Sequence, residues 1–198
     1  DLLHERGVDV SYESVRCRWH RFGSQFANQI KKRRAGGMQS SNWKWHLDEV
    51  FVKINGERHY LWRAVDHEGE VLESYVTKKR DKKAALKFMK KAMRRYGSPN
   101  EIVTDKLRSY SAAAKVVGCA DKQVTQRWAN NRAENSHLPF RRRERVMLRF
   151  RRMHSLQKFA SIHASFHNLF NSQRSLSKRS TFKLNRDAAL TEWRSLIA

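Results

Sequence analysis

Alternating hydrophobic and polar positions divide the middle of the chain into short strands. The run at 45–54 is rich in β-branched and aromatic residues, and the Asn55-Gly56 pair that follows is the strongest short hairpin signal. Residues 57–66 supply the returning strand, and a second turn leads to a third strand at 71–77. The pattern therefore predicts three consecutive antiparallel strands.

Helical periodicity begins after the third strand. Between 81 and 96, apolar residues share one face while lysine and arginine occupy the other, and a Gly-Ser-Pro sequence ends the helix. A fourth short strand is predicted to end at Thr104, a helix to cover 109–117, and a weak fifth strand to lie near 122–126. The remainder reads as helical. This order predicts an α/β fold with a mixed sheet flanked by helices.

Residues 1–30 predict a small helical unit. The segment 2–7 resembles the end of a helix closed by a glycine, and Ser11 is a suitable N-cap for a second helix. Three apolar residues share one face of that helix: Val15, Trp19 and Phe22. Three arginines lie on its other faces: Arg16, Arg18 and Arg21. The pattern is typical of a partial helix-turn-helix DNA reader, and an ordinary helical hairpin with a solvated charged face fits it equally.

The segments flanking the main domain have simpler patterns. Residues 31–42 begin with four basic residues followed by Ala-Gly-Gly, which predicts a basic, flexible linker. Near the C-terminus, apolar residues predict a helix that covers the core: Leu184, Leu190, Trp193 and Leu196. Residues 176–198 are therefore expected to form a C-terminal helical extension.

The charge balance indicates a polyanionic partner. Lysine and arginine number 42 against 19 aspartate and glutamate, giving a net charge of +23 and a pI near 10.8. Such an excess repels itself in the folded state and is typical of proteins that bind nucleic acid. No apolar stretch reaches the ~18 residues of a spanning helix. Cys17 and Cys119 match no metal or disulfide spacing, which favours a reducing, cytoplasmic setting.

Three acidic residues stand in distinctive frames within this basic chain. Asp48 lies inside the first strand in the frame His-Leu-Asp-Glu, Asp105 directly follows the fourth strand, and Glu134 lies in the helical frame Asn-Asn-Arg-Ala-Glu-Asn. Carboxylates are hard oxygen ligands that Mg²⁺ prefers, and clustered like charges are costly without a cation between them. The three acids predict a divalent-metal site for phosphoryl transfer.

Each acid also has a structural interpretation. Adjacent strand residues point to opposite faces, so Glu49 is the alternative ligand to Asp48, although aspartate inside a strand is disfavoured unless it has a role. Asp105 can cap the helix that follows it. Glu134 can pair with neighbouring arginines on a helix surface. The ordered set of three favours the metal-site interpretation.

In this order, the three frames resemble those of bacterial DDE transposases, whose catalytic core is integrase-like and therefore ribonuclease-H-like. The chain is most similar to the group of short insertion sequences numbered six, and Tyr-Leu-Trp-Arg-Ala-Val-Asp at 60–66 belongs to the same pattern. The resemblance extends over essentially the whole chain, with an N-terminal reader that lacks a helix. The 29 positions from Asp105 to Glu134 are fewer than the family pattern implies, and the shortening falls around 118–126.

The resemblance implies a transposase that cleaves DNA and transfers strands with two Mg²⁺ ions, for which Mn²⁺ can substitute. It implies that Asp48 bridges both ions while Asp105 and Glu134 each hold one. It also implies that Arg141, seven positions after Glu134, contacts the DNA backbone. Neighbouring arginines are expected to neutralise further phosphates: Arg142, Arg143 and Arg145. The chain contains no ATP-binding phosphate loop, so no nucleotide cofactor is expected.

The resemblance further implies a catalytic core at 43–175 that acts in transposition, DNA recombination and DNA integration. The expected partners are the element's terminal repeats and a target duplex, bound by a homo-oligomer in the bacterial cytoplasm near the nucleoid. Two other functions stay open. One is a metal-dependent nuclease of the same fold that cuts without joining, and the other is a non-catalytic DNA-binding remnant.

Overall fold

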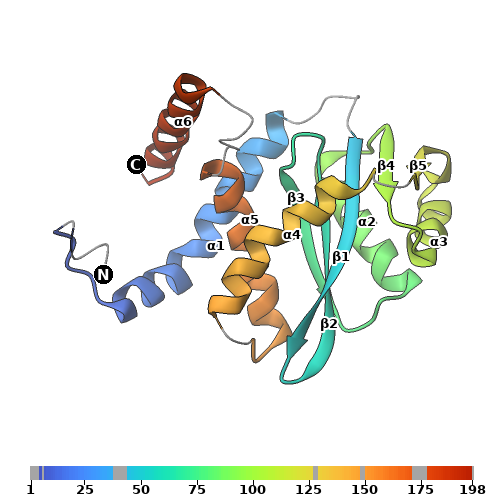
Figure 1. Cartoon of the computed structure of the whole chain (residues 1–198), viewed down its shortest axis with the longest axis horizontal. Helices are drawn as coiled ribbons and strands as arrows, with labels where there is room; N and C mark the ends of the chain where they lie inside the picture. The colour runs from blue at the N-terminus through green and yellow to red at the C-terminus, as the bar shows by residue number, and fades with distance from the viewer. Residues whose placement is uncertain are drawn as a thin grey trace.

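A mixed five-stranded sheet forms the centre of the protein, with helices on both faces (Figure 1). The computed structural model describes residues 5, 7–37, 44–126, 129–147, 150–170 and 178–197. The sheet order is β3-β2-β1-β4-β5. The strands are β1 (Lys44–Ile54), β2 (Glu57–Val65), β3 (Val71–Thr77), β4 (Glu101–Thr104) and β5 (Gln123–Val124). The first three are antiparallel, whereas β4 is parallel to β1 and β5 is parallel to β4.

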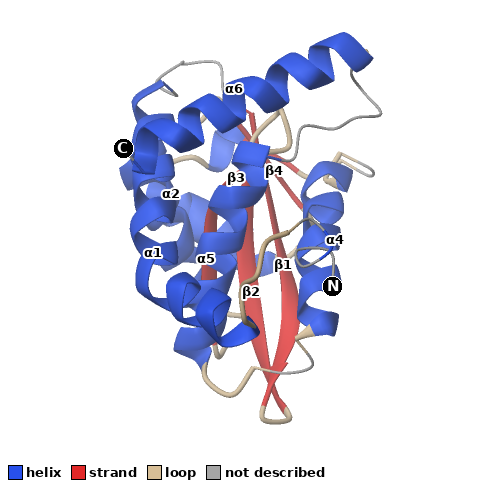
Figure 2. Cartoon of the chain, turned by 90° about the vertical axis from the view of Figure 1, so that its left-hand side faces the viewer, coloured by secondary structure: helices blue, strands red, loops and turns tan. Residues whose placement is uncertain are grey.

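Helices cover the sheet from both sides, and the views of Figures 1 and 2 agree on this arrangement. The helices are α1 (Tyr12–Gly37), α2 (Lys82–Tyr96), α3 (Arg108–Val117), α4 (Asn131–Val146), α5 (Met153–Phe170) and α6 (Arg179–Ile197), with a short 3₁₀ turn at Ala120–Lys122. The helices α2 and α3 pack on one face, and α4 and α5 pack on the other. None of the described helices is long and apolar enough to cross a membrane.

The predicted strands and the hairpin are confirmed. Asn55 and Gly56 both have positive φ angles, 51° and 85°, as a tight two-residue hairpin of right-handed twist requires. The predicted helix at 81–96 is also confirmed, because the Asp81 side chain caps α2 by accepting a hydrogen bond from the Ala84 N–H at 2.8 Å. The two predicted short strands are present as well, with β4 paired to β1 and β5 paired to β4.

Two hydrophobic cores lie on opposite sides of the sheet. Trp45 and Leu47 of β1 face α2 and α3, while Val52 and Ile54 face α4 and α5. Both faces of β1 are therefore covered, as expected for a strand in the middle of a sheet. Between these apolar residues, Asp48 and Glu49 occupy adjacent positions and so project to opposite sides.

The edge strand β3 is protected by side chains from α5. The Gln157 amide accepts from the Val76 N–H at 2.8 Å and donates to the Ser74 carbonyl at 2.9 Å. Asn168 does the same at Val71, with distances of 3.0 and 2.9 Å. These amides replace the hydrogen bonds that another strand would make, which blocks edge-to-edge pairing and fixes α5 against the sheet.

The linker prediction is wrong for residues 31–37, because α1 continues as a helix to Gly37. Lys31 is 7% exposed, and its ammonium donates to Ser161 Oγ of α5 at 2.9 Å. Ile30 is fully buried beside Leu169 of α5. Packing against α5 and α6 stabilises the helix where the local composition favours a flexible chain. Residues 38–42 of the predicted linker lie outside the described residues.

The N-terminal part of α1 is helical, as the pattern around Ser11 predicts. Its apolar face is only partly covered: Trp19 packs on Phe159 of α5, whereas Val15 and Phe22 are 46% and 38% exposed. Most of the predicted preceding helix lies at residues 1–4 and 6, outside the described residues. The helix-turn-helix reader therefore stays a prediction.

The C-terminal helix α6 packs against helices rather than against the sheet. Trp193 and Leu196 contact the apolar face of α1, whereas Leu184 and Leu190 are 68% and 39% exposed. The prediction that all four apolar residues cover the core is thus wrong for Leu184 and Leu190. The helix α6 packs against both α1 and the end of α5, and the opposite side of α6 is exposed to solvent.

Buried histidines predict acid sensitivity. Burial lowers the pKa of His46 and of His163 to about 4 from the ordinary value of 6.5, and the Arg63 charge adds to the effect at His163. Histidines in the unfolded chain take up protons at a higher pH than these two imidazoles do in the folded protein. Their contribution to the free energy of unfolding is therefore complete above about pH 6.5 and is lost as the pH falls through about 4.

We expect His163→Phe to reduce this loss by on the order of 2 kcal/mol, measured by urea unfolding at about pH 7 and about pH 4.5. Phenylalanine suits the site because Phe140 and Phe159 lie beside the imidazole, with ring centroids 6.4 and 5.6 Å away. Identical acid-dependent losses in variant and wild type would contradict the assignment.

Candidate active site

Asp48 lies near the middle of β1 and points to the side of the sheet that α4 covers. Its Oδ2 atom is 3.0 Å from Nε2 of His137 on α4. Both side chains are largely shielded, with exposed fractions of 16% for Asp48 and 8% for His137. Burial lowers the pKa of His137, and the hydrogen bond to Asp48 opposes this shift. The imidazole therefore holds the Asp48 carboxylate in one orientation.

Glu49, the next residue of β1, points to the opposite side. Its carboxylate is 2% exposed and forms an ion pair with Arg80, which lies just before α2. Burial raises the pKa of Glu49 to about 7, against the opposing effects of the Tyr110 hydroxyl and the Arg80 guanidinium. Glu49 is therefore a carboxylate that a nearby cation would stabilise in its charged form.

Asp105 follows β4 at the point where this strand leaves the sheet. Because Thr104 pairs in parallel register with Leu47, Asp105 emerges beside Asp48. Its Oδ1 accepts from the Leu107 N–H at 3.0 Å, and its Oδ2 is 3.7 Å from the Arg80 guanidinium. Burial raises the pKa of Asp105, and the Asp48 charge raises it further. Asp105 therefore does not cap α3, because the N-cap of that helix is Leu107 and carries no side-chain cap hydrogen bond. Its carboxylate closes the turn before the helix and also faces the acidic site.

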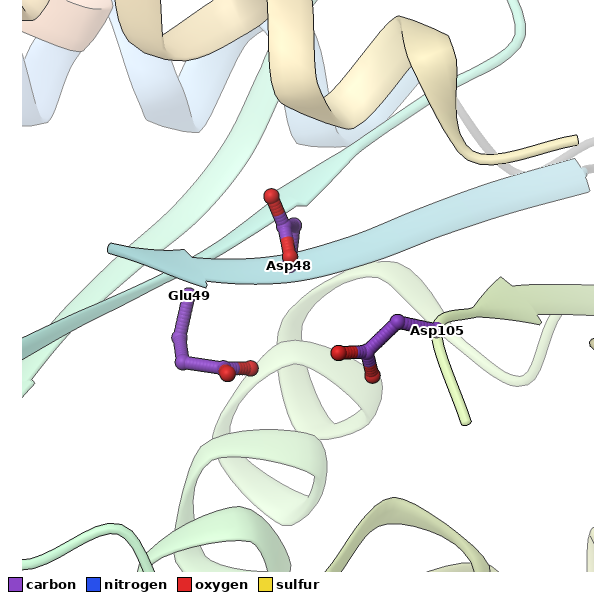
Figure 3. A group of neighbouring side chains, drawn as sticks. All are labelled: Asp48, Glu49 and Asp105. Carbon is purple, nitrogen blue, oxygen red and sulfur yellow. The ribbon is translucent and has the colours of Figure 1, made fainter. Parts of the chain in front are cut away.

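Three carboxylates converge at this point of the sheet. One oxygen each of Asp48, Glu49 and Asp105 lies within 4.8 Å of the other two. Figure 3 shows Glu49 and Asp105 pointing towards each other below β1, with Asp48 above them on the same strand as Glu49. Hard oxygen donors at this separation suit a divalent cation such as Mg²⁺, which would relieve the repulsion between like charges.

The structure differs from the sequence prediction at the third acid. Among the described residues, Glu49 completes the cluster of three, while Glu134 is exposed in the first turn of α4. The helix itself is held close to the site, because the Asn130 side chain donates to the Leu47 carbonyl at 2.9 Å. Glu134 also precedes His137 by three residues. A ligand role for Glu134 stays a prediction.

The predicted DNA-contacting arginines lie on two helices. Arg141 of α4 donates to the Phe51 carbonyl at 2.6 Å and also pairs with Glu144. The other three predicted arginines of α4 are exposed: Arg142, Arg143 and Arg145. The three predicted arginines of α1 are also exposed: Arg16, Arg18 and Arg21, of which Arg16 pairs with Glu13. Their contacts with DNA stay predictions.

Sequence reasoning missed three polar residues that support the site: Arg63, Arg80 and His137. Arg63 is 2% exposed, lies opposite Asp48 in the register of β1 and β2, and donates to the Ser136 carbonyl of α4. The tight turn at Asn55-Gly56 sets that register, so the pairing of Arg63 with Asp48 was predictable. The contacts of Arg80 and His137 depend on tertiary packing and had no local signal.

Comparison with known proteins identifies similar sequences. A family profile described as a DDE domain matches residues 42–173. The transposase for the insertion sequence-like element IS431mec of Staphylococcus aureus is 34% identical over 142 residues, which is 69% of this chain and 62% of that protein. The S. aureus transposase for insertion sequence element IS257 in transposon Tn4003 is 33% identical over the same shares. The chain thus spans less than two thirds of the length of these relatives.

Among solved structures, the fold is similar to a chain in the cryo-EM structure of the simian T-cell lymphotropic virus intasome in complex with PP2A regulatory subunit B56 gamma. The TM-score is 0.50, the sequence identity is 14%, and the match covers 68% of this chain and 50% of that chain. This similarity concerns the fold alone. It confirms the predicted ribonuclease-H-like sheet with flanking helices.

Proposed function

We propose that this chain, which belongs to the family of DDE transposase domains, catalyses DNA cleavage and strand transfer in the transposition of an insertion sequence. The observation that carries the proposal is the convergence of Asp48 and Asp105. These two acids come from neighbouring parallel strands and lie in two of the three sequence frames that resemble the family. In a chain of net charge +23, a partly buried cluster of three carboxylates carries a cost in free energy that a bound cation would offset.

Divalent metal ions, Mg²⁺ with Mn²⁺ as a substitute, are the proposed cofactors. The donor set fits them, because Asp48, Glu49 and Asp105 offer only carboxylate oxygens within 4.8 Å of one another. When bound as a pair, such ions activate an attacking oxygen and stabilise a leaving oxygen at phosphorus. Asp48 would be shared by the two ions, and Asp105 would hold one of them.

Glu134 is the proposed ligand of the second ion. It is three residues before His137, which contacts Asp48, and residues three apart on a helix are neighbours on its surface. Asn130 anchors the start of this helix to the backbone of β1, one residue before Asp48. Glu49 is the alternative third ligand, supported by its position in the cluster.

DNA is the proposed partner, in the form of the element's terminal repeats and a target duplex. The net charge of +23 and the exposed arginines of α4 support this proposal. Further proposals from family membership are a homo-oligomer assembled on DNA and a location at the nucleoid in the bacterial cytoplasm. Two sets of arginines would contact the phosphate backbone: Arg16, Arg18 and Arg21 of α1, and Arg141, Arg142, Arg143 and Arg145 of α4. Such contacts position a protein on DNA without specifying sequence.

A strand-transfer assay tests the proposal directly. A pre-cleaved duplex carrying the element's end is incubated with supercoiled target DNA and the protein in Mg²⁺, in Mn²⁺, or in EDTA. We expect joined products with either metal and none in EDTA. Metal-dependent cutting without joining would favour the nuclease. DNA binding with no metal-dependent product would favour the non-catalytic remnant.

A further inference from the structure

An exposed aromatic ring lies next to the acidic cluster. Phe51 is 48% exposed although it belongs to the central strand β1. It follows Glu49 by two residues, so both side chains project to the same side of the sheet. A large apolar ring in water, beside a buried site, costs free energy unless something covers it.

Two guanidinium groups frame this ring. The Arg58 guanidinium carbon is 5.1 Å from the centre of the Phe51 ring, and that of Arg141 is 5.4 Å away. Arg141 is held in place by its hydrogen bond to the Phe51 carbonyl. Within the described part of the chain, Arg58 pairs with no carboxylate, so its charge is available to an incoming anion.

A small cavity connects the ring to the acidic cluster. It has a volume of about 140 Å³ and is lined by Glu49, Phe51, Arg58, Tyr60 and Arg80. At roughly 30 Å³ per water molecule, this volume corresponds to about four or five waters, so the cavity is too small for a duplex. Its lining combines aromatic surface, two guanidinium groups and one buried carboxylate.

We propose that this cavity binds an unpaired base of the DNA strand next to the reacting phosphate, with the base stacked on Phe51 and the adjoining phosphate on Arg58. Every nucleobase has a face that stacks on an aromatic ring, and arginine both stacks and binds phosphate. Inside the cavity the charges of Glu49 and Arg80 offset each other, whereas Arg58 pairs with no carboxylate of the described chain, so the neutral base enters and the phosphate stays at the Arg58 rim. This inference rests on the proposed function, because DNA must reach the carboxylates.

The test measures binding without catalysis. Equilibrium affinities are determined, in the absence of divalent metal, for a blunt duplex and for the same duplex with a short unpaired overhang carrying 2-aminopurine. We expect Phe51→Ala to weaken binding of the overhang DNA by about five- to hundredfold, with little change for the blunt duplex. The fluorescence of 2-aminopurine should be quenched by the wild type and by Phe51→Trp, but not by Phe51→Ala.

Val116→Ala is the matched control, because Val116 is also a half-exposed apolar residue but lies on α3, away from this cavity. It should leave both affinities unchanged. Arg58→Ala should weaken overhang binding, whereas Arg58→Lys, which keeps the charge, should restore most of that affinity and leave the quenching by Phe51 in place. Equal losses for blunt and overhang DNA in Phe51→Ala, or no loss for either, would overturn the inference.

The two proposals fail separately. Selective overhang binding through Phe51, combined with no strand transfer in Mg²⁺, would contradict the proposed transposase function and support the base site. Normal strand transfer by the wild type, with Phe51→Ala binding both DNAs as the wild type does, would keep the transposase function and remove the base site.

Discussion

Asp48→Asn is expected to lower the rates of DNA cleavage and strand transfer by on the order of a thousandfold or more. A neutral amide is a poor ligand for Mg²⁺, and Asp48 is the acid proposed to serve both ions. DNA affinity should be kept or raised, because the substitution removes a negative charge beside the phosphates. Single-turnover cleavage and equilibrium DNA binding, measured on the same protein, separate the two effects.

Structural damage is controlled within the same experiment. An asparagine at position 48 can still accept the hydrogen bond from His137, so the thermal midpoint should change little. Asp105→Asn should lose activity in the same way. The matched control is Asp121→Asn, which removes an exposed acid from the 3₁₀ turn outside the cluster. A parallel loss of DNA affinity and activity in Asp48→Asn would indicate a structural role instead.

Glu134→Gln is expected to have a comparable effect on activity, and Glu49→Gln a smaller one. Glu134 is exposed, so its replacement should not change the free energy of unfolding. Glu49 is 2% exposed and pairs with Arg80, so Glu49→Gln leaves that guanidinium with only its contact to Asp105 and changes the charge of the cavity beside Phe51. Cleavage rates and Mn²⁺ affinity, the latter by titration calorimetry, are measured for both variants.

The comparison identifies the third metal ligand. Glu192→Gln on α6 serves as the control for removing a helical carboxylate that lies outside the cluster. Full activity in Glu134→Gln, together with lost Mn²⁺ affinity and lost cleavage in Glu49→Gln, would assign the third ligand to Glu49. The reverse pattern would show that α4 delivers Glu134 to the site when metal and DNA are present.

Local patterns were sufficient for much of the fold. The hydrophobic alternation and the Asn55-Gly56 turn determine the β1–β2 hairpin, because a two-residue turn sets the register of every following pair. That register places Arg63 opposite Asp48. Asp81 determines the start of α2 in the same local way, by capping its first turn. The convergence of Asp48 and Asp105 was also predicted, from the ordered frames that resemble the family, and the parallel pairing of β1 with β4 brings the two acids to one point of the sheet.

Tertiary packing decided what no local pattern determines. The helix α1 extends through 31–37 because Ile30 and Lys31 find partners on α5, about 130 residues away in the sequence. Glu49 joins the cluster because its long side chain reaches towards Asp105, which follows β4, although strand alternation points it away from Asp48. The contact of His137 with Asp48 depends on how α4 docks on β1. Backbone propensities act within a few residues, whereas ligand geometry depends on contacts between distant segments, which form only when the chain is packed.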